Sequence, residues 1–223
     1  MPSVISTANG SPVDIHWLDS LPSTQTYLTD ALRSGALKPP VCVAARMQTM
    51  GMGSRGNTWI GEEGNLFISV AVARSLLPED LKLESSSIYM AFLMKELLAS
   101  MGSRVWLKWP NDFYLGSQKI GGTITTVVNG ALVCGIGVNC VCAPEGFGVI
   151  DIPVKPYEIT ERYCSLFKNL PSWKQIFSKY QLEFEDSRVF STHYNHEKIA
   201  LKDAVLLEDG SLMCDGQRIF SLR

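Results

Sequence analysis

The window from residue 120 to residue 144 contains no charged side chain, and it limits what this chain can fold into. A membrane-spanning helix needs about 20 mostly apolar residues, but glycine and asparagine interrupt this window, which is rich in threonine and valine. Asn129-Gly130 separates two β-rich runs, 123–128 and Ala131–Val138. Asn-Gly is the strongest short hairpin signal because both residues tolerate a positive φ. The window therefore predicts a hairpin in a sheet buried on both faces.

The other hydrophobic patterns predict an α+β fold. Helices are expected from a cap at Ser23 or Thr24 to Gly35, and over 83–101 and 172–184, with strands over 41–45, 64–72 and 104–109. Strands and helices do not alternate regularly, which favours a mixed or antiparallel sheet. Short strands with Asp-Gly turns follow residue 198. We therefore expect a main domain over 1–187 and a small β module over 188–223.

Composition narrows the possible classes of function. The net charge of the 223 residues is −2, which argues against nucleic acid as the main partner because phosphate binding requires clustered lysine and arginine. Residues 1–12 lack the basic region and apolar core of a signal peptide. The six cysteines show no disulfide framework, so we expect reduced thiols and a cytoplasmic location. His193 and His196 lack the spacing and further ligands of a zinc site.

A glycine-rich segment, Gly51-x-Gly53-x-x-Gly56, formally matches a dinucleotide-binding fingerprint. That fingerprint requires a helix directly after it, and residues 57–64 do not predict one. The Gly-Lys-Ser/Thr of a phosphate-binding P-loop is also missing. Two interpretations stay open: a loop that embraces an anion through backbone N–H groups and Arg55, or a plain surface connection.

A second polar cluster is Lys108-Trp-Pro-Asn-Asp112, followed by Lys119 and Gly121-Gly122. Lysines could neutralise phosphate oxygens while Asp112 holds Mg²⁺, so the cluster suits a polyanionic substrate. The residues alone fit equally well a polar turn with a surface ion pair between Lys108 and Asp112.

Together these motifs resemble the biotin–protein ligases, also called biotin–[acetyl-CoA carboxylase] ligases. The likeness spans nearly the whole chain, and Lys-Trp-Pro-Asn-Asp with a second lysine at this spacing is its most specific part, whereas the glycine segment alone is weak. The matching segments are Ser23-Thr-Gln25, Gln48, Gly51 to Trp59, Gly64-Asn-Leu66, Lys108 to Asp112, Lys119-Ile-Gly-Gly122, Gly135-Ile-Gly-Val-Asn139 and the tail 206–223.

The resemblance implies a catalytic domain like that of class II aminoacyl-tRNA synthetases and biotin ligases, with an SH3-like C-terminal module. It also implies a two-step reaction. The biotin carboxylate attacks the α-phosphate of MgATP to give biotinyl-5′-AMP and pyrophosphate, and a lysine of the biotin carboxyl carrier domain of acetyl-CoA carboxylase then accepts the biotin. The alternatives are a lipoate or octanoyl ligase or transferase of the same superfamily, and a biotin-binding protein with impaired catalysis.

The resemblance also assigns roles to residues of this sequence. Lys119 would contact both the biotin carboxyl group and the phosphate, with Asp112 near the metal and Arg55 as a third catalytic residue. The residues expected to bind biotin are Ser23, Thr24, Gln25, Gln48, Gly51, Met52, Gly53, Ser54 and Lys119. Those expected to bind ATP or the adenylate are Trp59, Lys108, Asn111 and Asn139.

Three features depart from the family pattern. The family segment usually reads Gly-Arg-Gly-Arg-x-Gly, but Met52 and Ser54 occupy the arginine positions here, so we expect Arg55 to substitute in part. Gln25 stands where asparagine is commoner. No helix-turn-helix pattern precedes Asp14, so we expect a form without an N-terminal DNA-binding domain, acting as a monomer or homodimer.

Overall fold

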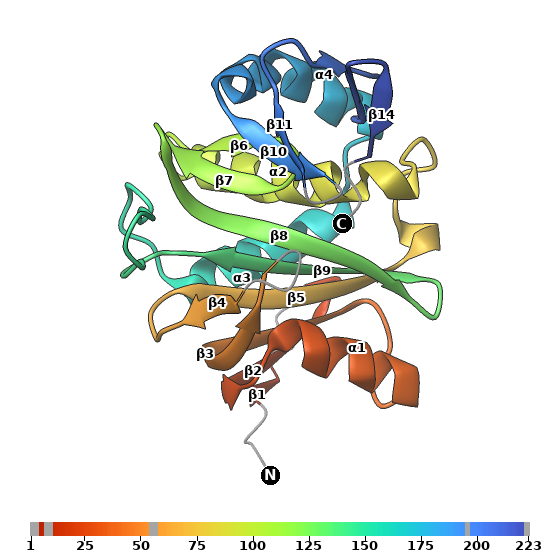
Figure 1. Ribbon diagram of the computed structural model, residues 1–223. Helices are drawn as coiled ribbons and strands as arrows, with labels where there is room; N and C mark the ends of the chain where they lie inside the picture. Colours follow the sequence, from red (N-terminus) through yellow and green to blue (C-terminus); the bar gives the residue numbers. More distant parts are fainter. Residues whose placement is uncertain (1–4, 7–10, 54–57, 195–196, 221–223) are drawn as a thin grey trace.

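The structure, a computed structural model, describes residues 5–6, 11–53, 58–194 and 197–220 (Figure 1). A mixed sheet of nine strands runs in the order β1-β2-β3-β5-β9-β8-β7-β6, and β4 pairs with β3 outside this path. Of the described pairs, β2 and β3 are parallel and the others are antiparallel. The predicted α+β fold with a mixed sheet is confirmed. The strands are β1 (Ile5–Ser6), β2 (Asp14–Leu21), β3 (Val41–Met52), β4 (Thr58–Gly61), β5 (Leu66–Ala73), β6 (Trp106–Lys108), β7 (Asp112–Leu115), β8 (Gln118–Val128) and β9 (Ala131–Val138).

The charge-free window forms the predicted hairpin of β8 and β9. Asn129 and Gly130 connect the strands with φ angles of 48° and 78°, as a type I′ turn requires. Strand β9 is buried along almost its whole length, whereas alternate residues of β8 remain half-buried from Gly122 to Thr126. Burial on both faces is therefore correct for β9 and only partly correct for β8. None of the described helices is long and apolar enough to cross a membrane.

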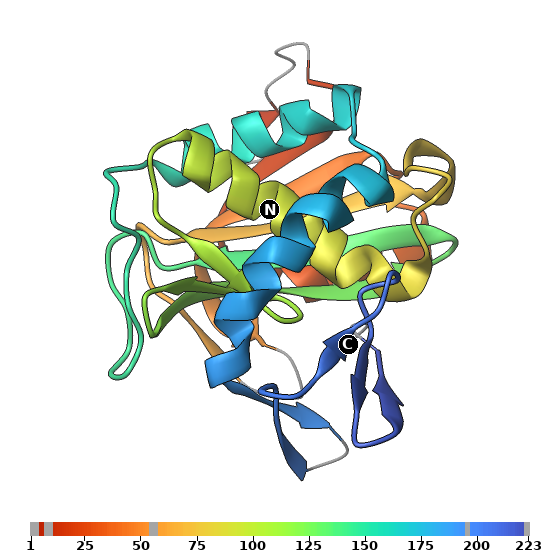
Figure 2. The same ribbon diagram turned by 90° about the horizontal axis from the view of Figure 1, so that it is seen from above.

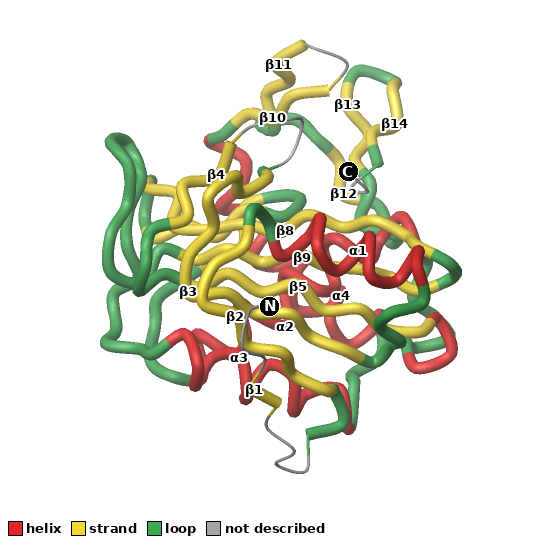
Figure 3. Tube along the Cα trace, turned by 90° about the horizontal axis from the view of Figure 1, so that it is seen from below, coloured by secondary structure: helices red, strands yellow, loops and turns green. Residues whose placement is uncertain are grey.

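Helices cover the two faces of the sheet unequally (Figures 2 and 3). On one face α1 (Thr24–Ser34) packs Leu28 and Leu32 against β3, β5 and β9. On the other face lie α2 (Ser86–Ser100), α3 (Pro156–Ser165) and α4 (Trp173–Glu183), within a larger core. Short 3₁₀ turns cover Arg74–Leu76, Leu83–Ser85, Leu166–Lys168 and Phe184–Val189.

Helix α1 has the ends that the sequence predicts. The Ser23 hydroxyl accepts a hydrogen bond from the backbone N–H of Thr26, and Gly35 ends the helix in the left-handed region at φ 75°. An N-cap of this kind satisfies one of the free N–H groups of the first turn. The first turn of α1 is thereby fixed beside the ends of β2 and β3.

Two elements differ from the sequence prediction. Helix α3 was not predicted, although it buries Ile159, Tyr163 and Cys164. The glycine segment begins as strand rather than loop, because β3 continues to Met52 where β4 pairs with it. That pairing follows a β-bulge between Gln48 and Gly51, and a bulge bends a strand and redirects its side chains.

The C-terminal part forms two small antiparallel sheets, as predicted. Strands β10 (Ser191–Tyr194) and β11 (Glu197–Ala200) make a hairpin, while β12 (Val205–Leu206), β13 (Leu212–Cys214) and β14 (Gln217–Ile219) make a three-stranded sheet. The Trp109 indole donates to the Gly210 carbonyl at 2.8 Å, and the Trp173 indole donates to the Glu208 carbonyl at 2.9 Å. The turn before β13 is therefore anchored on the main domain. A boundary at residue 187 stays a prediction.

Candidate active site

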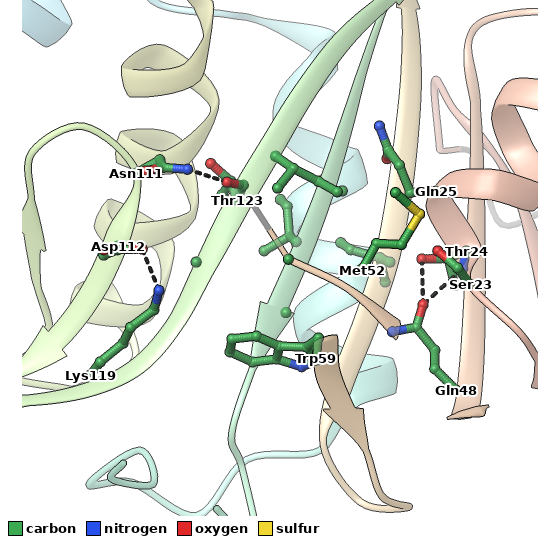
Figure 4. A pocket seen from close by; sticks show the side chains of 17 residues that line it. Ser23, Thr24, Gln25, Gln48, Met52, Trp59, Asn111, Asp112, Lys119 and Thr123 are labelled. Carbon is green, nitrogen blue, oxygen red and sulfur yellow. Dashed lines mark hydrogen bonds and ion pairs between the residues drawn. The ribbon is translucent and has the colours of Figure 1, made fainter. Parts of the chain in front are cut away.

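A pocket opens on the face of the sheet that carries α1, beyond the first turn of that helix (Figure 4). Ten of the residues predicted to bind ligands line it together. They are Ser23, Thr24, Gln25, Gln48, Met52, Gly53, Trp59, Asn111, Asp112 and Lys119. Sequence reasoning did not name the other lining residues as site residues, and these are Ile68, Gly122, Thr123, Ile124, Gly135, Ile136 and Gly137.

Two glycines of β9 make room for the pocket. Val133 packs under α1, and Gly135 and Gly137 follow it on the same face of the strand because side chains alternate. A Cβ at residue 135 would lie 2.7 Å from Gln25 Oε1, and one at residue 137 would lie 2.9 Å from Cε2 of the Trp59 ring. Only glycine allows both side chains to approach the sheet this closely. Along one face of β9 the sequence changes from valine to glycine. This change is the sequence signal that could have identified the part of the pocket that β9 forms.

One end of the pocket is polar and uncharged. Gln48 Oε1 accepts from the backbone N–H of Thr24 at 2.8 Å and from its hydroxyl at 3.1 Å. The buried Ser69 hydroxyl donates to Thr24 Oγ1 at 2.9 Å. These bonds hold Gln48 by its oxygen, so its amide nitrogen is the group left to donate. Ser69, which sequence reasoning missed, fixes this end from the sheet.

The opposite end of the pocket carries an ion pair. Lys119 Nζ lies 2.6 Å from Asp112 Oδ1, and Figure 4 shows this pair across the pocket from Thr24 and Gln48. Lys108 Nζ lies 3.7 Å from Asp112 Oδ2, and the Lys108 side chain is only 8% exposed. The ion pair between Lys108 and Asp112 that the alternative expected is therefore present, but it is largely buried and does not lie on the surface. A carboxylate held between two ammonium groups leaves a net positive charge at this end.

Asn111 connects the strands at the charged end. Its side-chain nitrogen donates to the Thr123 carbonyl, and its own carbonyl accepts from the Thr123 backbone N–H at 2.9 Å. Asn111 thus holds the start of β7 against β8, on which Lys119 lies. These two contacts join the strand that begins at Asp112 to the strand that carries Lys119. Asn111 therefore helps to hold Lys119 and Asp112 in place relative to each other.

Two buried polar atoms in the pocket have no hydrogen-bond partner within the described part of the chain. They are Gln25 Oε1 and Trp59 Nε1, which lie against Gly135 and Gly137 of the pocket. Leaving a buried donor or acceptor unsatisfied costs about 1–3 kcal/mol. An unsatisfied acceptor and an unsatisfied donor in the pocket therefore favour a ligand that has hydrogen-bonding groups of its own.

The other predicted site residues lie elsewhere. Lys108 lines a neighbouring cavity. Gly51 is buried opposite Trp59 in the β3–β4 pair. Asn139 donates from its side chain to the Gly148 carbonyl at 3.0 Å, as a strand-end anchor would. Ser54 and Arg55 lie outside the described residues, so their roles stay predictions.

The matching segment Gly64-Asn-Leu66 has a structural role. Asn65 Oδ1 accepts from the backbone N–H groups of Cys140 and Val141 at 2.8 and 2.9 Å, and its amide nitrogen donates to the Cys142 carbonyl at 2.8 Å. One buried side chain thereby fixes the chain where it leaves β9. The other end of that strand bears the hairpin turn.

Metal-binding capacity at the site is limited to one carboxylate. Among the described residues no three or more His, Cys, Asp or Glu side chains gather to hold a metal ion. Asp112 is the single carboxylate in the described pocket lining. Mg²⁺ is usually held by one or two carboxylates together with substrate phosphates. The residues therefore suit a magnesium ion that enters with a nucleotide rather than a resident metal.

The fold and the pocket define a protein that binds a small molecule between a neutral polar end and a cationic end. The biotin/lipoate A/B protein ligase family matches residues 17–141, which is more than half of the chain. A crystal structure of the biotin acetyl coenzyme A carboxylase synthetase from Helicobacter pylori, with bound biotinylated ATP, is 43% identical, with a TM-score of 0.88 over 92% of this chain and 98% of that chain. The chain belongs to the biotin/lipoate A/B protein ligase family.

Curated relatives are longer than this chain. The bifunctional ligase/repressor BirA of Escherichia coli is 30% identical over 143 residues, which are 61% of this chain and 43% of that protein. The biotin–[acetyl-CoA-carboxylase] ligase of Mycobacterium tuberculosis is 30% identical over 128 residues, or 55% of this chain and 48% of that protein. This chain thus spans less than half the length of these two relatives.

Proposed function

We propose that this protein is an ATP-dependent biotin–protein ligase. It activates biotin as biotinyl-5′-AMP and transfers the biotinyl group to a lysine of a biotin carboxyl carrier domain. The observation that carries the proposal is the pairing of Lys119 with Asp112 across the pocket from the unsatisfied Gln25 oxygen. A carboxylic acid with a polar ring at its far end matches both ends of such a pocket.

Biotin matches the pocket group by group. Its ureido ring carries two N–H donors and one carbonyl acceptor, which suit Gln25 Oε1 and the amide nitrogen of Gln48. Its fused ring and valeryl chain are apolar, and the glycines of β9 with Ile124 and Ile136 offer an uncharged wall. Its carboxylate then reaches Lys119. The dithiolane of lipoate has no hydrogen-bond donor, so it would leave the Gln25 oxygen unsatisfied.

The charged end supports the activation step. A carboxylate and a triphosphate repel each other, so a site that joins them must supply positive charge where they meet. Lys119 provides that charge from the pocket side, and the buried Lys108 provides it from behind Asp112. Asp112 holds the two ammonium groups in place and can ligate the Mg²⁺ that accompanies ATP.

The second half-reaction involves the protein partner. The lysine of the carrier attacks the activated carbonyl and releases AMP, giving an amide. We infer that this takes place in the cytoplasm, because ATP is available there and all six cysteines are free thiols.

Substitution of Lys119 tests the proposal. Lys119→Ala is expected to lower the rate of biotin-dependent ATP–pyrophosphate exchange by about 100-fold or more, because it removes a preorganised charge from the site where negative charge gathers. Lys179→Ala is the matched control, since Lys179 is 62% exposed and pairs with Glu96 away from the pocket. The assay contains protein, biotin, MgATP and a carrier domain, and it follows pyrophosphate and biotinylated carrier.

The outcomes separate the candidate functions. Full activity of Lys119→Ala would refute the catalytic role of this lysine. Pyrophosphate release with lipoate and not with biotin would favour a lipoate ligase. Tight binding of biotin without any pyrophosphate release would favour a binding protein.

A further inference from the structure

Strand β6 lies at the end of the main sheet, and among the described strands it pairs only with β7. An edge strand leaves a row of backbone groups without a strand partner, and N–H groups two residues apart point to the same edge. The Leu107 N–H donates to Glu183 Oε1, and the Trp109 N–H donates to Ser187 Oγ at 3.1 Å. Glu183 is the last residue of α4, and Ser187 lies in the 3₁₀ turn that follows. Two side chains thus take the place of a further strand.

Glu183 is a largely buried carboxylate with a largely buried partner. Its side chain and that of Lys95 in α2 are each 13% exposed, and Lys95 Nζ pairs with Glu183 Oε2. Burial raises the pKa of Glu183, and the bonds from Lys95 and Leu107 act against that rise. A buried carboxylate costs free energy unless it is both paired and hydrogen-bonded. Glu183 meets both conditions with different oxygens, and it thereby joins α2, α4 and β6.

The residue between the two fixed N–H groups is Lys108. Leu107 and Trp109 are fully buried, and side chains alternate along a strand, so Lys108 extends from the other face. Lys108 Nζ lies 3.7 Å from Asp112 Oδ2 and 5.7 Å from the centre of the Tyr114 ring. Because 3.7 Å is longer than a hydrogen bond, the backbone position of Lys108 affects how closely its charge approaches Asp112.

We propose that Glu183 and Ser187 are positioning residues for the activation of the carboxylate: they fix the edge of β6 and thereby hold the Lys108 ammonium beside Asp112. This inference rests on the proposed function. Both residues act through Lys108, which supplies charge where the carboxylate and the triphosphate meet. A charge that is held in place before the reaction requires no reorganisation during it, and a misplacement of about 1 Å can cost about 100-fold in rate.

Variants of the two positioning residues test the inference in the full chain. Glu183→Ala is expected to lower kcat of biotin-dependent ATP–pyrophosphate exchange by about tenfold. Its Kd for biotin should change little, because the neutral end of the pocket belongs to α1 and β3. Glu183→Gln keeps an oxygen that can accept from Leu107, so it should restore most of kcat. Ser187→Ala, which removes the second contact, should lower kcat in the same way by a smaller factor.

Glu96→Ala is the matched control. Glu96 is a carboxylate of the same ion-pair network, where it pairs with Lys95 and Lys179, and it makes no described contact with β6. Its removal should leave kcat unchanged. A double-mutant cycle with Lys108→Met separates positioning from general stability. If Glu183 acts through Lys108, Glu183→Ala should lower kcat much less once the ammonium has been removed, because coupled residues show non-additive energies.

All rates are corrected for the folded fraction, which circular dichroism measures. A normal kcat for Glu183→Ala, or strictly additive losses in the cycle with Lys108→Met, overturns the positioning role. If Glu183→Ala does not fold, Ser187→Ala and its own cycle with Lys108→Met decide the question by the same criteria. An unmodified protein without any biotin-dependent exchange would refute the proposed function, and the positioning role would fall with it. Normal exchange that does not depend on residues 183 and 187 would overturn the positioning role alone.

Discussion

At the scale of single residues, the close approach of Trp59 to Gly137 shapes the pocket. A methyl group at residue 137 would meet three atoms of the indole ring at 2.9 to 3.2 Å. Gly137→Ala is therefore expected to displace the ring and weaken ligand binding by about tenfold or more, while the chain stays folded. Biotin and ATP affinities from calorimetry, with circular dichroism for the fold, check this.

A double-mutant cycle identifies the cause of that loss. If the contact with Trp59 is responsible, Gly137→Ala should have much less effect when Trp59→Ala has already removed the ring, because neighbouring residues show non-additive energies. Strictly additive losses would instead mean that the methyl group excludes the ligand directly.

The sequence predicted the polar site residues better than the walls between them. Lys119 and Asp112 were found because Lys-Trp-Pro-Asn-Asp and the spacing to the second lysine resemble the family motif, whereas the residues alone fitted a polar turn equally well. Ser69 and Gly135 were missed, because their importance comes from strand register, which brings Ser69 of β5 directly opposite Gly135 of β9. Such cross-strand neighbours are not contained in any local pattern.

At the scale of elements, local signals were sufficient where the turn itself determines the structure. The β8–β9 hairpin follows from Asn129-Gly130, and α1 follows from its caps. Helix α3 and strand β4 were not predicted, because each is stabilised by partners distant in sequence: α3 by the core shared with α2, and β4 by the end of β3. Tertiary contacts thus stabilise the helix and the strand that the local sequence pattern does not predict.

The turn between β12 and β13 depends on Asp209. Asp209 Oδ1 accepts from the Ser211 backbone N–H at 3.1 Å and from its hydroxyl at 2.6 Å, and Arg218 pairs with the other oxygen. Burial by itself raises the pKa of Asp209, but the bonds from Ser211 and the charge of Arg218 outweigh it, so the pKa is lowered. The carboxylate is therefore stabilised in the folded state.

A lowered pKa predicts the direction of the pH dependence. The stabilisation is fully present above the unfolded pKa of about 3.9 and is lost as pH falls through the lower folded value. Asp209→Asn is expected to reduce the urea midpoint at pH 7 and to flatten its decline below about pH 4, as followed by tryptophan fluorescence. Asp215→Asn, in the exposed turn before β14, is the control and should change the urea midpoint at pH 7 little.

At the scale of the whole molecule, the main domain and the C-terminal module share one hydrophobic core. The cluster that contains Ile88 and Trp109 continues into Leu201, Leu212 and Ile219. Trp109 comes from the segment between Lys108 and Asp112, so the packing that supports the ion pair is also the packing that anchors the module. The shared core therefore couples the position of the module to that of the ion pair.

A shared core predicts cooperative unfolding of the full chain. Leu201 is fully buried between β11 and β12, and Leu201→Ala is expected to cost about 3 kcal/mol from lost burial and the remaining cavity. For a chain of this size that lowers Tm by roughly 6–12 °C. Calorimetry should show one transition that moves as a whole, whereas Leu182→Ala, at a side chain that is 74% exposed, should change Tm little. Two transitions, of which only one moves, would instead mean that the module unfolds independently and would support a domain boundary near residue 187.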